Sequence, residues 1–189
     1  LGAVGRDRHM GDALLGHDFS FKLVADYTDS LLPWTYALTA FWAGQEGSFL
    51  FWTLALAVVG LFWAGSSSGR GVPAESTCAF WMVYSLVQAF FFLILTTVSN
   101  PLLQLSPPPA DGNGLNPLLQ HPGMVFHPPL LFIGYAGLTV PAAAGLGTVF
   151  VQDDAWLERV RNWTLTAWIF LTAGIVLGAW WSYMELGWG

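Results

Sequence analysis

Long apolar runs, separated by polar loops, dominate the pattern along the chain. Four of these runs cover residues 48–64, 78–98, 125–151 and 165–184. A helix needs about 20 residues to cross the hydrocarbon core of a bilayer, and a backbone surrounded by lipid must satisfy its own hydrogen bonds. The pattern therefore predicts an all-α, polytopic integral membrane helical bundle, with residues 48–189 as a four-span membrane domain.

The first 47 residues have a different pattern. Residues 31–47 contain several aromatic and leucine side chains, but the apolar run is too short to span a membrane. Such a segment suits a helix that lies in the plane of the membrane interface. Residues 1–47 are therefore predicted to form an external loop with one interfacial helix.

The charges of the loops predict which side of the membrane each loop faces. The loop after the first span carries Arg70, and the loop after the third span carries Arg159 and Arg161. Residues 99–124, between the second and third spans, carry neither lysine nor arginine. Because positively charged loops stay in the cytoplasm, this proline-rich loop is predicted to face the outside.

Composition excludes several functional classes. Of the 189 residues, 54% are hydrophobic and only 10% are charged, whereas about a quarter are charged in soluble domains. The net charge of −6 comes without a cluster of lysine or arginine, so the expected partner is a lipid bilayer and no nucleic acid. A single cysteine, Cys78, leaves no Cys-x-x-Cys redox pair and no thiolate zinc site. Since the chain begins at Leu1 without a signal segment and stops at Gly189, we expect an internal piece of a longer membrane protein.

His127 is the strongest candidate for a chemical function. It precedes Pro128 and Pro129 at the point where the polar loop meets the third span. A residue before proline avoids the α region and proline is tolerated in the first turn of a helix, so His127 is predicted directly before the third helix. Imidazole is a common axial ligand of haem iron, but an interfacial histidine that hydrogen-bonds a loop carbonyl is the more frequent case. His121 lacks the two prolines and is predicted to be loop surface.

Aromatic residues gather at the end of the fourth span. They include Trp180, Trp181 and Trp188. Aromatic belts are normal at a membrane interface, and this interpretation explains most such clusters. A flat aromatic shelf can also stack against a porphyrin, which is large, planar and apolar. Glu46 and Glu185 flank spans on the same side and are expected to be solvated loop carboxylates.

Several longer motifs resemble one family of membrane proteins. One motif reads Trp-Ala-Gly-Gln-Glu-Gly-Ser at residues 42–48, and another reads His-Pro-Pro-Leu-Leu-Phe-Ile-Gly-Tyr at residues 127–135. In this order they resemble the CcmF-type haem-handling proteins of cytochrome c biogenesis. Further matching segments are residues 18–20, 32–36, 115–120, 163–168 and 178–189. In that family a tryptophan-rich signature, W-G-x-x-W-x-W-D, binds haem, and residues 188–189 resemble its first two positions.

The resemblance implies a function in cytochrome c maturation. It implies a haem-binding membrane subunit of a cytochrome c haem lyase (cytochrome c synthetase), which presents haem b for thioether attachment to apocytochrome c. It also implies His127 as an axial ligand of the haem iron and Trp180, Trp181 and Trp188 as a haem platform, with no catalytic side chain in this chain. The implied partners are apocytochrome c, a CcmE-type haem carrier and a CcmH-type thiol-reducing subunit. The implied location is the bacterial inner membrane, with the haem site on the outer, periplasmic face.

Two alternatives stay open from the sequence. A haem-delivery protein of the CcmC type or a synthase of the CcsA type would share the histidine and the tryptophan signature. A haem-free membrane transporter or structural scaffold would share only the membrane composition. A visible spectrum of the full-length protein would separate the last alternative from the others.

Overall fold

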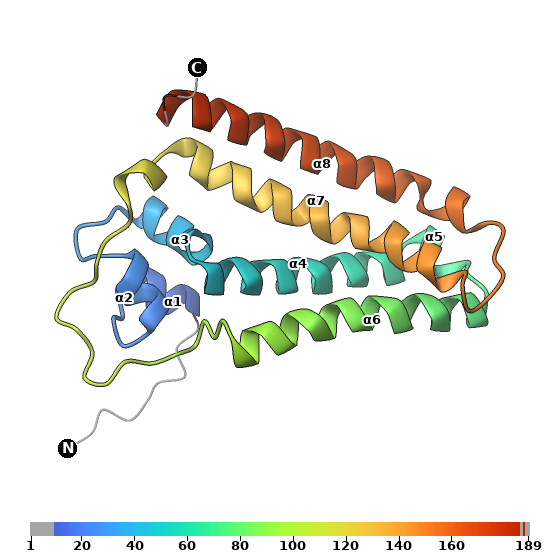
Figure 1. Ribbon diagram of the computed structural model, residues 1–189, viewed down its shortest axis with the longest axis horizontal. Helices are drawn as coiled ribbons and strands as arrows, with labels where there is room; N and C mark the ends of the chain where they lie inside the picture. The colour runs from blue at the N-terminus through green and yellow to red at the C-terminus, as the bar shows by residue number, and fades with distance from the viewer. Residues whose placement is uncertain (1–9, 186, 188–189) are drawn as a thin grey trace.

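Four long helices lie side by side in the computed structural model, which describes residues 10–185 and 187 (Figure 1). They are α4 (Gln45–Gly65), α6 (Ala74–Thr97), α7 (Pro122–Gly147) and α8 (Trp156–Glu185). Each of these helices is long and apolar enough to cross a membrane. The predicted all-α, multi-pass membrane bundle is therefore confirmed.

The short helices of the N-terminal segment gather at one end of this bundle (Figure 1). They are α1 (Met10–Leu15), α2 (Lys22–Tyr27) and α3 (Trp34–Ala43). The chain between α6 and α7, residues 98–121, returns to the same end and contains the 3-10 helix η1 (Pro117–Leu119). We call α1–α3 with residues 98–121 the cap, and this end of the bundle the cap end. The far end carries α5 (Ser67–Arg70) and the loop of residues 148–155.

Backbone hydrogen bonds join the two parts of the cap. The N–H of Lys22 donates to Leu103 O at 2.8 Å, and the N–H of Asn113 donates to Ala25 O at 2.7 Å. Gly114 has φ +80°, a left-handed conformation that favours glycine. A small apolar core lies beneath these contacts and consists of Ala13, Leu14, Phe21, Leu23, Val24 and Ala40. The cap is therefore a folded unit in which residues 10–43 and a later loop support each other.

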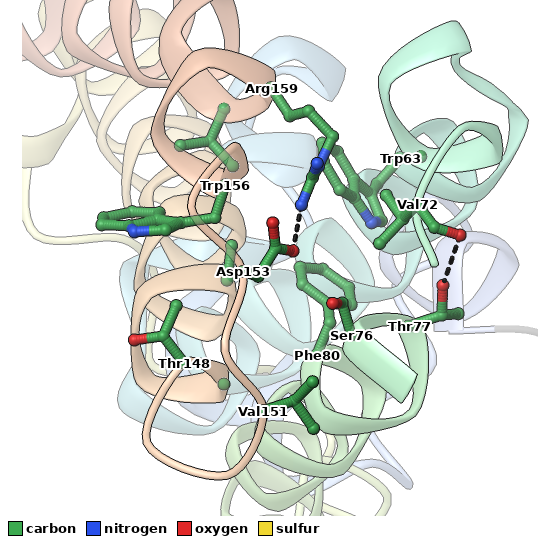
Figure 2. A pocket seen from close by; sticks show the side chains of 14 residues that line it. Trp63, Val72, Ser76, Thr77, Phe80, Thr148, Val151, Asp153, Trp156 and Arg159 are labelled. Atoms are coloured by element: carbon green, nitrogen blue, oxygen red, sulfur yellow. Dashed lines mark hydrogen bonds and ion pairs between the residues drawn. The ribbon is translucent and has the colours of Figure 1, made fainter. Parts of the chain in front are cut away.

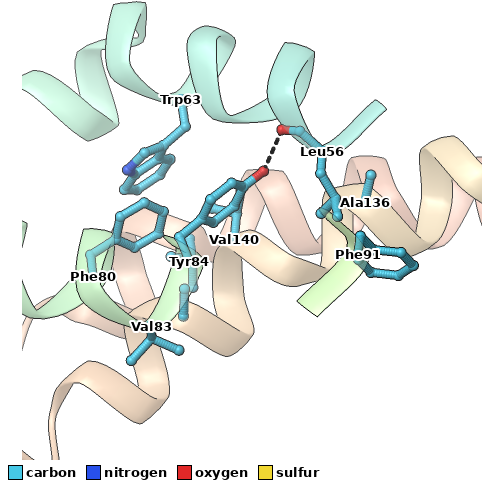
Figure 3. Packing of buried hydrophobic residues seen from close by; sticks show 10 residues of the cluster. Leu56, Trp63, Phe80, Val83, Tyr84, Phe91, Ala136 and Val140 are labelled. Carbon is cyan, nitrogen blue, oxygen red and sulfur yellow. Dashed lines mark hydrogen bonds between the residues drawn. The ribbon is translucent and has the colours of Figure 1, made fainter. Parts of the chain in front are cut away.

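Aromatic side chains fill the core between α4, α6 and α7 (Figure 3). Trp63 stacks on Phe80 with ring centroids 5.1 Å apart. The hydroxyl of Tyr84 donates to the backbone oxygen of Leu56 at 2.7 Å, which satisfies a polar group that lipid could not. Val140 of α7 is fully buried in the same cluster. These contacts hold α7, the helix that carries His127, against the rest of the bundle.

Small residues let α7 and α8 approach closely. A Cβ atom at Gly134 of α7 would lie 2.8 Å from the backbone nitrogen of Leu171 in α8. A Cβ atom at Gly174 of α8 would lie 2.8 Å from a methyl carbon of Leu131 in α7. Close backbone approach through small residues is a common way to pack helices inside a membrane.

The third long helix begins earlier than the sequence suggested. Because α7 starts at Pro122, His127 lies in its second turn and not directly before it, so that prediction is wrong. The ring of His121 caps the helix, since its Nδ1 accepts a hydrogen bond from the N–H of Gly123 at 2.9 Å. Pro122 occupies the first helical position, where a missing N–H costs nothing. Pro128 and its neighbour at position 129 therefore fall inside the helix.

Candidate functional site

His127 points from α7 onto α8 at the cap end of the bundle. Its Nδ1 lies 2.6 Å from the backbone oxygen of Gly174. A carbonyl oxygen can only accept, so Nδ1 carries the proton of the neutral ring and Nε2 keeps its lone pair. The ring also covers Gly178, where a Cβ atom would come within 2.4 Å of the His127 Cε1. Histidines that bind metals commonly have this kind of second bond, which fixes the tautomer and the ring orientation.

Trp42 supports the turn of α7 from which His127 projects. Pro128 has no N–H, so it cannot donate to the oxygen of Met124 four residues earlier. The indole Nε1–H of Trp42, in α3, donates to this oxygen instead, at 2.9 Å. The cap thus satisfies a carbonyl that the proline leaves without its helical donor. Sequence reasoning missed Trp42, although a proline inside a helix is itself a signal that some other donor is needed.

Two tryptophans near the end of α8 lie beside His121, the cap of α7, and His127 inside α7. The ring of Trp181 is 6.2 Å from that of His127, and the ring of Trp180 is 5.3 Å from that of His121, measured between centroids. Trp181 Nε1 is buried without a hydrogen-bond partner in the described part of the chain, whereas Trp180 is 47% exposed. Trp188, the third tryptophan of the predicted platform, lies outside the described residues. Two of the three predicted tryptophans therefore stand at the same end of the bundle as His127.

His121 has a structural role that the sequence did not predict. Its Nδ1 accepts the capping hydrogen bond, so the proton of the neutral ring is on Nε2, which lies 3.6 Å from Glu185 Oε1. The side chain is only 14% exposed, so the prediction of loop surface is wrong. Glu185 likewise belongs to α8 and not to a loop. Because Nδ1 accepts the capping bond and Nε2 carries the proton, neutral His121 has no free lone pair for a metal.

The donor set at this site suits an axial ligand better than a bare metal ion. No group of three or more histidine, cysteine, aspartate or glutamate side chains that could hold a metal occurs among the residues that the structure describes. A porphyrin brings four nitrogen donors of its own, so one imidazole nitrogen is enough to add an axial bond. His127 Nε2, beside Trp181, is the atom that fits this requirement.

A second enclosed site lies at the far end but is too small for a ligand (Figure 2). Its volume is about 20 Å³, which is room for about one water molecule. Asp153 and Arg159 form an ion pair in its wall, beside Trp156. Burial alone would raise the pKa of Asp153, but hydrogen bonds from Arg159 and Ser76 lower it below its ordinary value. The geometry indicates a structural role, because these bonds fix the loop between α7 and α8 to helices α6 and α8.

Comparisons with known proteins agree with the geometry at the cap end. The sequence profile of a family described as "Cytochrome C assembly protein" matches residues 42–189. This range includes α4, α6, α7 and α8 and therefore the whole candidate site. The chain belongs to this family. The resemblance predicted from the motifs is thus confirmed, and the protein is a multi-pass membrane protein of cytochrome c biogenesis.

Individual relatives extend the match into the cap. The chain is 44% identical to the cytochrome c-type biogenesis protein CcmF of Pseudomonas aeruginosa over 180 residues, and 41% identical to the cytochrome c-type biogenesis protein ccl1 of Rhodobacter capsulatus over 179 residues. Each alignment covers 94% of this chain and 27% of the relative. A CcmF of Haemophilus influenzae is 40% identical over 92% of the chain. The chain thus spans about a quarter of the length of these relatives. No solved structure matches it.

Proposed function

We propose that this chain provides one side of the external haem site in a CcmF-type subunit of a cytochrome c haem lyase. The observation that carries the proposal is the bond between His127 Nδ1 and Gly174 O, which leaves Nε2 free to bind iron. Family membership supports the haem-handling context. Since the chain spans about a quarter of its relatives, the second axial ligand and the rest of the platform would come from other parts of the longer protein.

The side chains at the cap end would position haem and exclude water from it. His127 would hold the iron through Nε2, while Gly174 O fixes the ring. Trp180 and Trp181 would cover an apolar face or edge of the macrocycle, and the sequence adds Trp188 as a third candidate for this platform. Haem b, when bound, supplies two vinyl groups, and each apocytochrome thiol adds its sulfur to one vinyl carbon and its hydrogen to the other. Positioning of this kind lowers the barrier without a catalytic acid or base from this chain.

The proposed partners follow from the same chemistry. An apocytochrome c would supply the thiols that add to the haem vinyl groups. A CcmE-type carrier would deliver haem to the site, and a CcmH-type subunit would keep the apocytochrome thiols reduced. The visible spectrum separates this function from that of a haem-free scaffold. A scaffold would show no Soret band in the full-length protein under any expression condition.

The decisive experiment compares His127→Ala with His121→Ala in the full-length protein. His127→Ala should abolish cytochrome c maturation and the haem spectrum while the protein stays in the membrane. Added imidazole should restore part of both signals by filling the vacated ligand position. His121→Ala removes a helix cap worth about 0.5–2 kcal/mol, so it should lower stability without removing the haem ligand. Wild-type maturation by His127→Ala would refute the ligand assignment, as would failure of imidazole to restore any haem binding.

We also propose that the cap end faces the periplasm, as the loop charges indicate. In a version of the full-length protein without other cysteines, Asn113→Cys in the cap should react with a membrane-impermeant thiol reagent in intact cells. Asp154→Cys, in the loop at the far end, should react only after the membrane is broken. The reverse labelling pattern would overturn the proposed orientation.

A further inference from the structure

A cavity at the cap end, separate from the histidines and tryptophans, combines one acidic and one basic side chain. Its volume is about 390 Å³, within the range of about 300–1,000 Å³ typical of small-molecule sites. Lys22 from α2 and Glu46 from α4 are its charged lining residues, and Thr96, Thr97 and Asn100 add polar groups from the end of α6 and the loop after it. The cavity therefore lies where two membrane helices, α4 and α6, meet the cap.

Glu46 leaves an unsatisfied acceptor at this cavity. The expectation that Glu46 is a solvated loop carboxylate is wrong, because the residue lies in the first turn of α4 and its Oε2 is buried. Within the described residues, this oxygen has no hydrogen-bond partner. A buried carboxylate oxygen without a donor is costly, and the cavity that Glu46 lines has room for an N–H or O–H donor to this carboxylate.

The charges around the cavity favour a ligand that carries an ammonium group. Lys22 forms an ion pair with Asp26, and these two charges cancel. Glu46 also lies close enough to Lys22 for an electrostatic interaction, so Lys22, Asp26 and Glu46 together keep a net charge of −1 that a ligand ammonium would neutralise. The side chain of Lys22 remains 43% exposed, so its other N–H groups can still bind a negatively charged group at the rim. Asn100 Oδ1 accepts from Leu102 N–H at 2.9 Å, which leaves the amide NH₂ of Asn100 as a second donor there.

The surface below the cavity is apolar and belongs to a membrane span. Phe90, Phe92 and Leu93 of α6 are 54–60% exposed, one to two helical turns before Thr96 and Thr97. A ligand at this place can thus have a polar head in the cavity and hydrocarbon chains along α6. Lipids with phosphate and a primary ammonium in one headgroup fit all of these features.

We propose that this cavity binds the headgroup of phosphatidylethanolamine, with the ammonium on Glu46 and the phosphate near Lys22 and Asn100. The primary ammonium donates N–H bonds to the Glu46 carboxylate. A choline headgroup has no N–H, and a glycerol headgroup carries no positive charge, so neither satisfies this carboxylate equally well. The proposal is independent of the haem site and places a lipid where the cap joins the bundle.

The test uses haem-free, full-length protein in nanodiscs that contain phosphatidylethanolamine, phosphatidylcholine or phosphatidylglycerol. Native mass spectrometry should show that the wild-type protein retains phosphatidylethanolamine about tenfold better than phosphatidylcholine, as one charge-assisted hydrogen bond would give. Glu46→Gln should remove this preference. Lys22→Met should weaken retention of phosphatidylethanolamine and phosphatidylglycerol alike, because it removes the phosphate partner. Soluble phosphoethanolamine should compete only weakly, since it lacks the hydrocarbon chains.

Two control variants separate this site from its surroundings. Glu75→Gln changes a glutamate that also lies in the first turn of a membrane helix, but at the far end, and should keep the preference. His127→Ala should keep it as well, even where haem binding is lost. Equal retention of the lipids by the wild-type protein would overturn the proposal and indicate that a basic side chain from another part of the protein occupies the cavity. Unchanged preference in Glu46→Gln, or an equal loss in Glu75→Gln, would also overturn it.

Discussion

Gly178 gives the sharpest test of how His127 is held. A Cβ atom added at position 178 would lie 2.4 Å from Cε1, 2.6 Å from Nδ1 and 3.0 Å from Nε2 of the His127 ring. Ordinary contacts between such atoms are about 3.5–4.0 Å, so the ring would have to move by about 1 Å. The ring is also tied to Gly174 O at 2.6 Å, and a shift of this size breaks that bond. Gly178→Ala therefore perturbs the candidate ligand without changing the ligand itself.

The expected cost of Gly178→Ala is about 1–3 kcal/mol, the usual range for an added group in a packed core. The cost should nearly vanish in the His127→Ala background, because the new methyl group then enters the space that the ring has left. A double-mutant cycle should therefore give a coupling energy of about 1–3 kcal/mol. Thermal or denaturant unfolding of the full-length protein in detergent measures all four variants. In the functional assay, Gly178→Ala should lower haem retention at least about tenfold, since 1.4 kcal/mol corresponds to that factor.

Gly65→Ala is the matched control. Gly65 also lies in a membrane helix, but nothing stands within 4 Å of a Cβ atom placed there. Alanine should be neutral at this position or stabilise the helix by up to about 1 kcal/mol. The proposed packing would be refuted if Gly178→Ala cost no more than Gly65→Ala. It would equally be refuted if Gly178→Ala cost the same in the presence and in the absence of the His127 ring.

Two further predictions concern the supports at the two ends of the bundle. Trp42→Phe keeps an aromatic ring but leaves the oxygen of Met124 without its donor, so it should lower the unfolding free energy by about 1–3 kcal/mol and broaden the Soret band of the haem-loaded protein. Asp153→Asn breaks the ion pair with Arg159 and should cost about 1–3 kcal/mol at pH 7 in a thermal melt. Because the folded-state pKa of Asp153 is lowered, its stabilisation is present above its unfolded pKa of about 3.9 and is lost as the pH falls through the folded value. The two melting curves should therefore converge in acid, and a constant difference down to about pH 2 would contradict this role.

The apolar pattern was enough to predict the number of spans and the class of fold. Long apolar runs without charges have few alternatives in a membrane protein, and helix length then follows from bilayer thickness. The pattern was less informative about where a helix begins. The prolines at positions 128 and 129 suggested a helix start, whereas α7 starts at Pro122. The actual start depends on the ring of His121 as a cap, and histidine is not among the residues that usually signal one.

The candidate site could be predicted only in part. The double proline and the family motif drew attention to His127, but its hydrogen-bond partner Gly174 is 47 positions away. The hydrogen bond from Trp42 Nε1–H to Met124 O joins two residues that are 82 positions apart. Membrane helices are apolar on all sides, so their sequence does not show which face meets which neighbour. Without the contacts of the folded chain, the sequence distinguishes His127 from His121 mainly by the two prolines that follow His127.

The prolines after His127 make the best case for a link between the cap and the site. Inside α7, Pro128 has no N–H that could donate to Met124 O, four residues earlier. The indole N–H of Trp42 in α3 donates to this oxygen instead. The turn that carries His127 is therefore completed by a residue of the cap and not by its own helix. A change in how α3 sits on the bundle would alter this hydrogen bond before it altered any contact within α7. The Trp42 indole N–H therefore links the cap directly to the helical turn that holds His127, in addition to the capping bond of His121 at the start of α7.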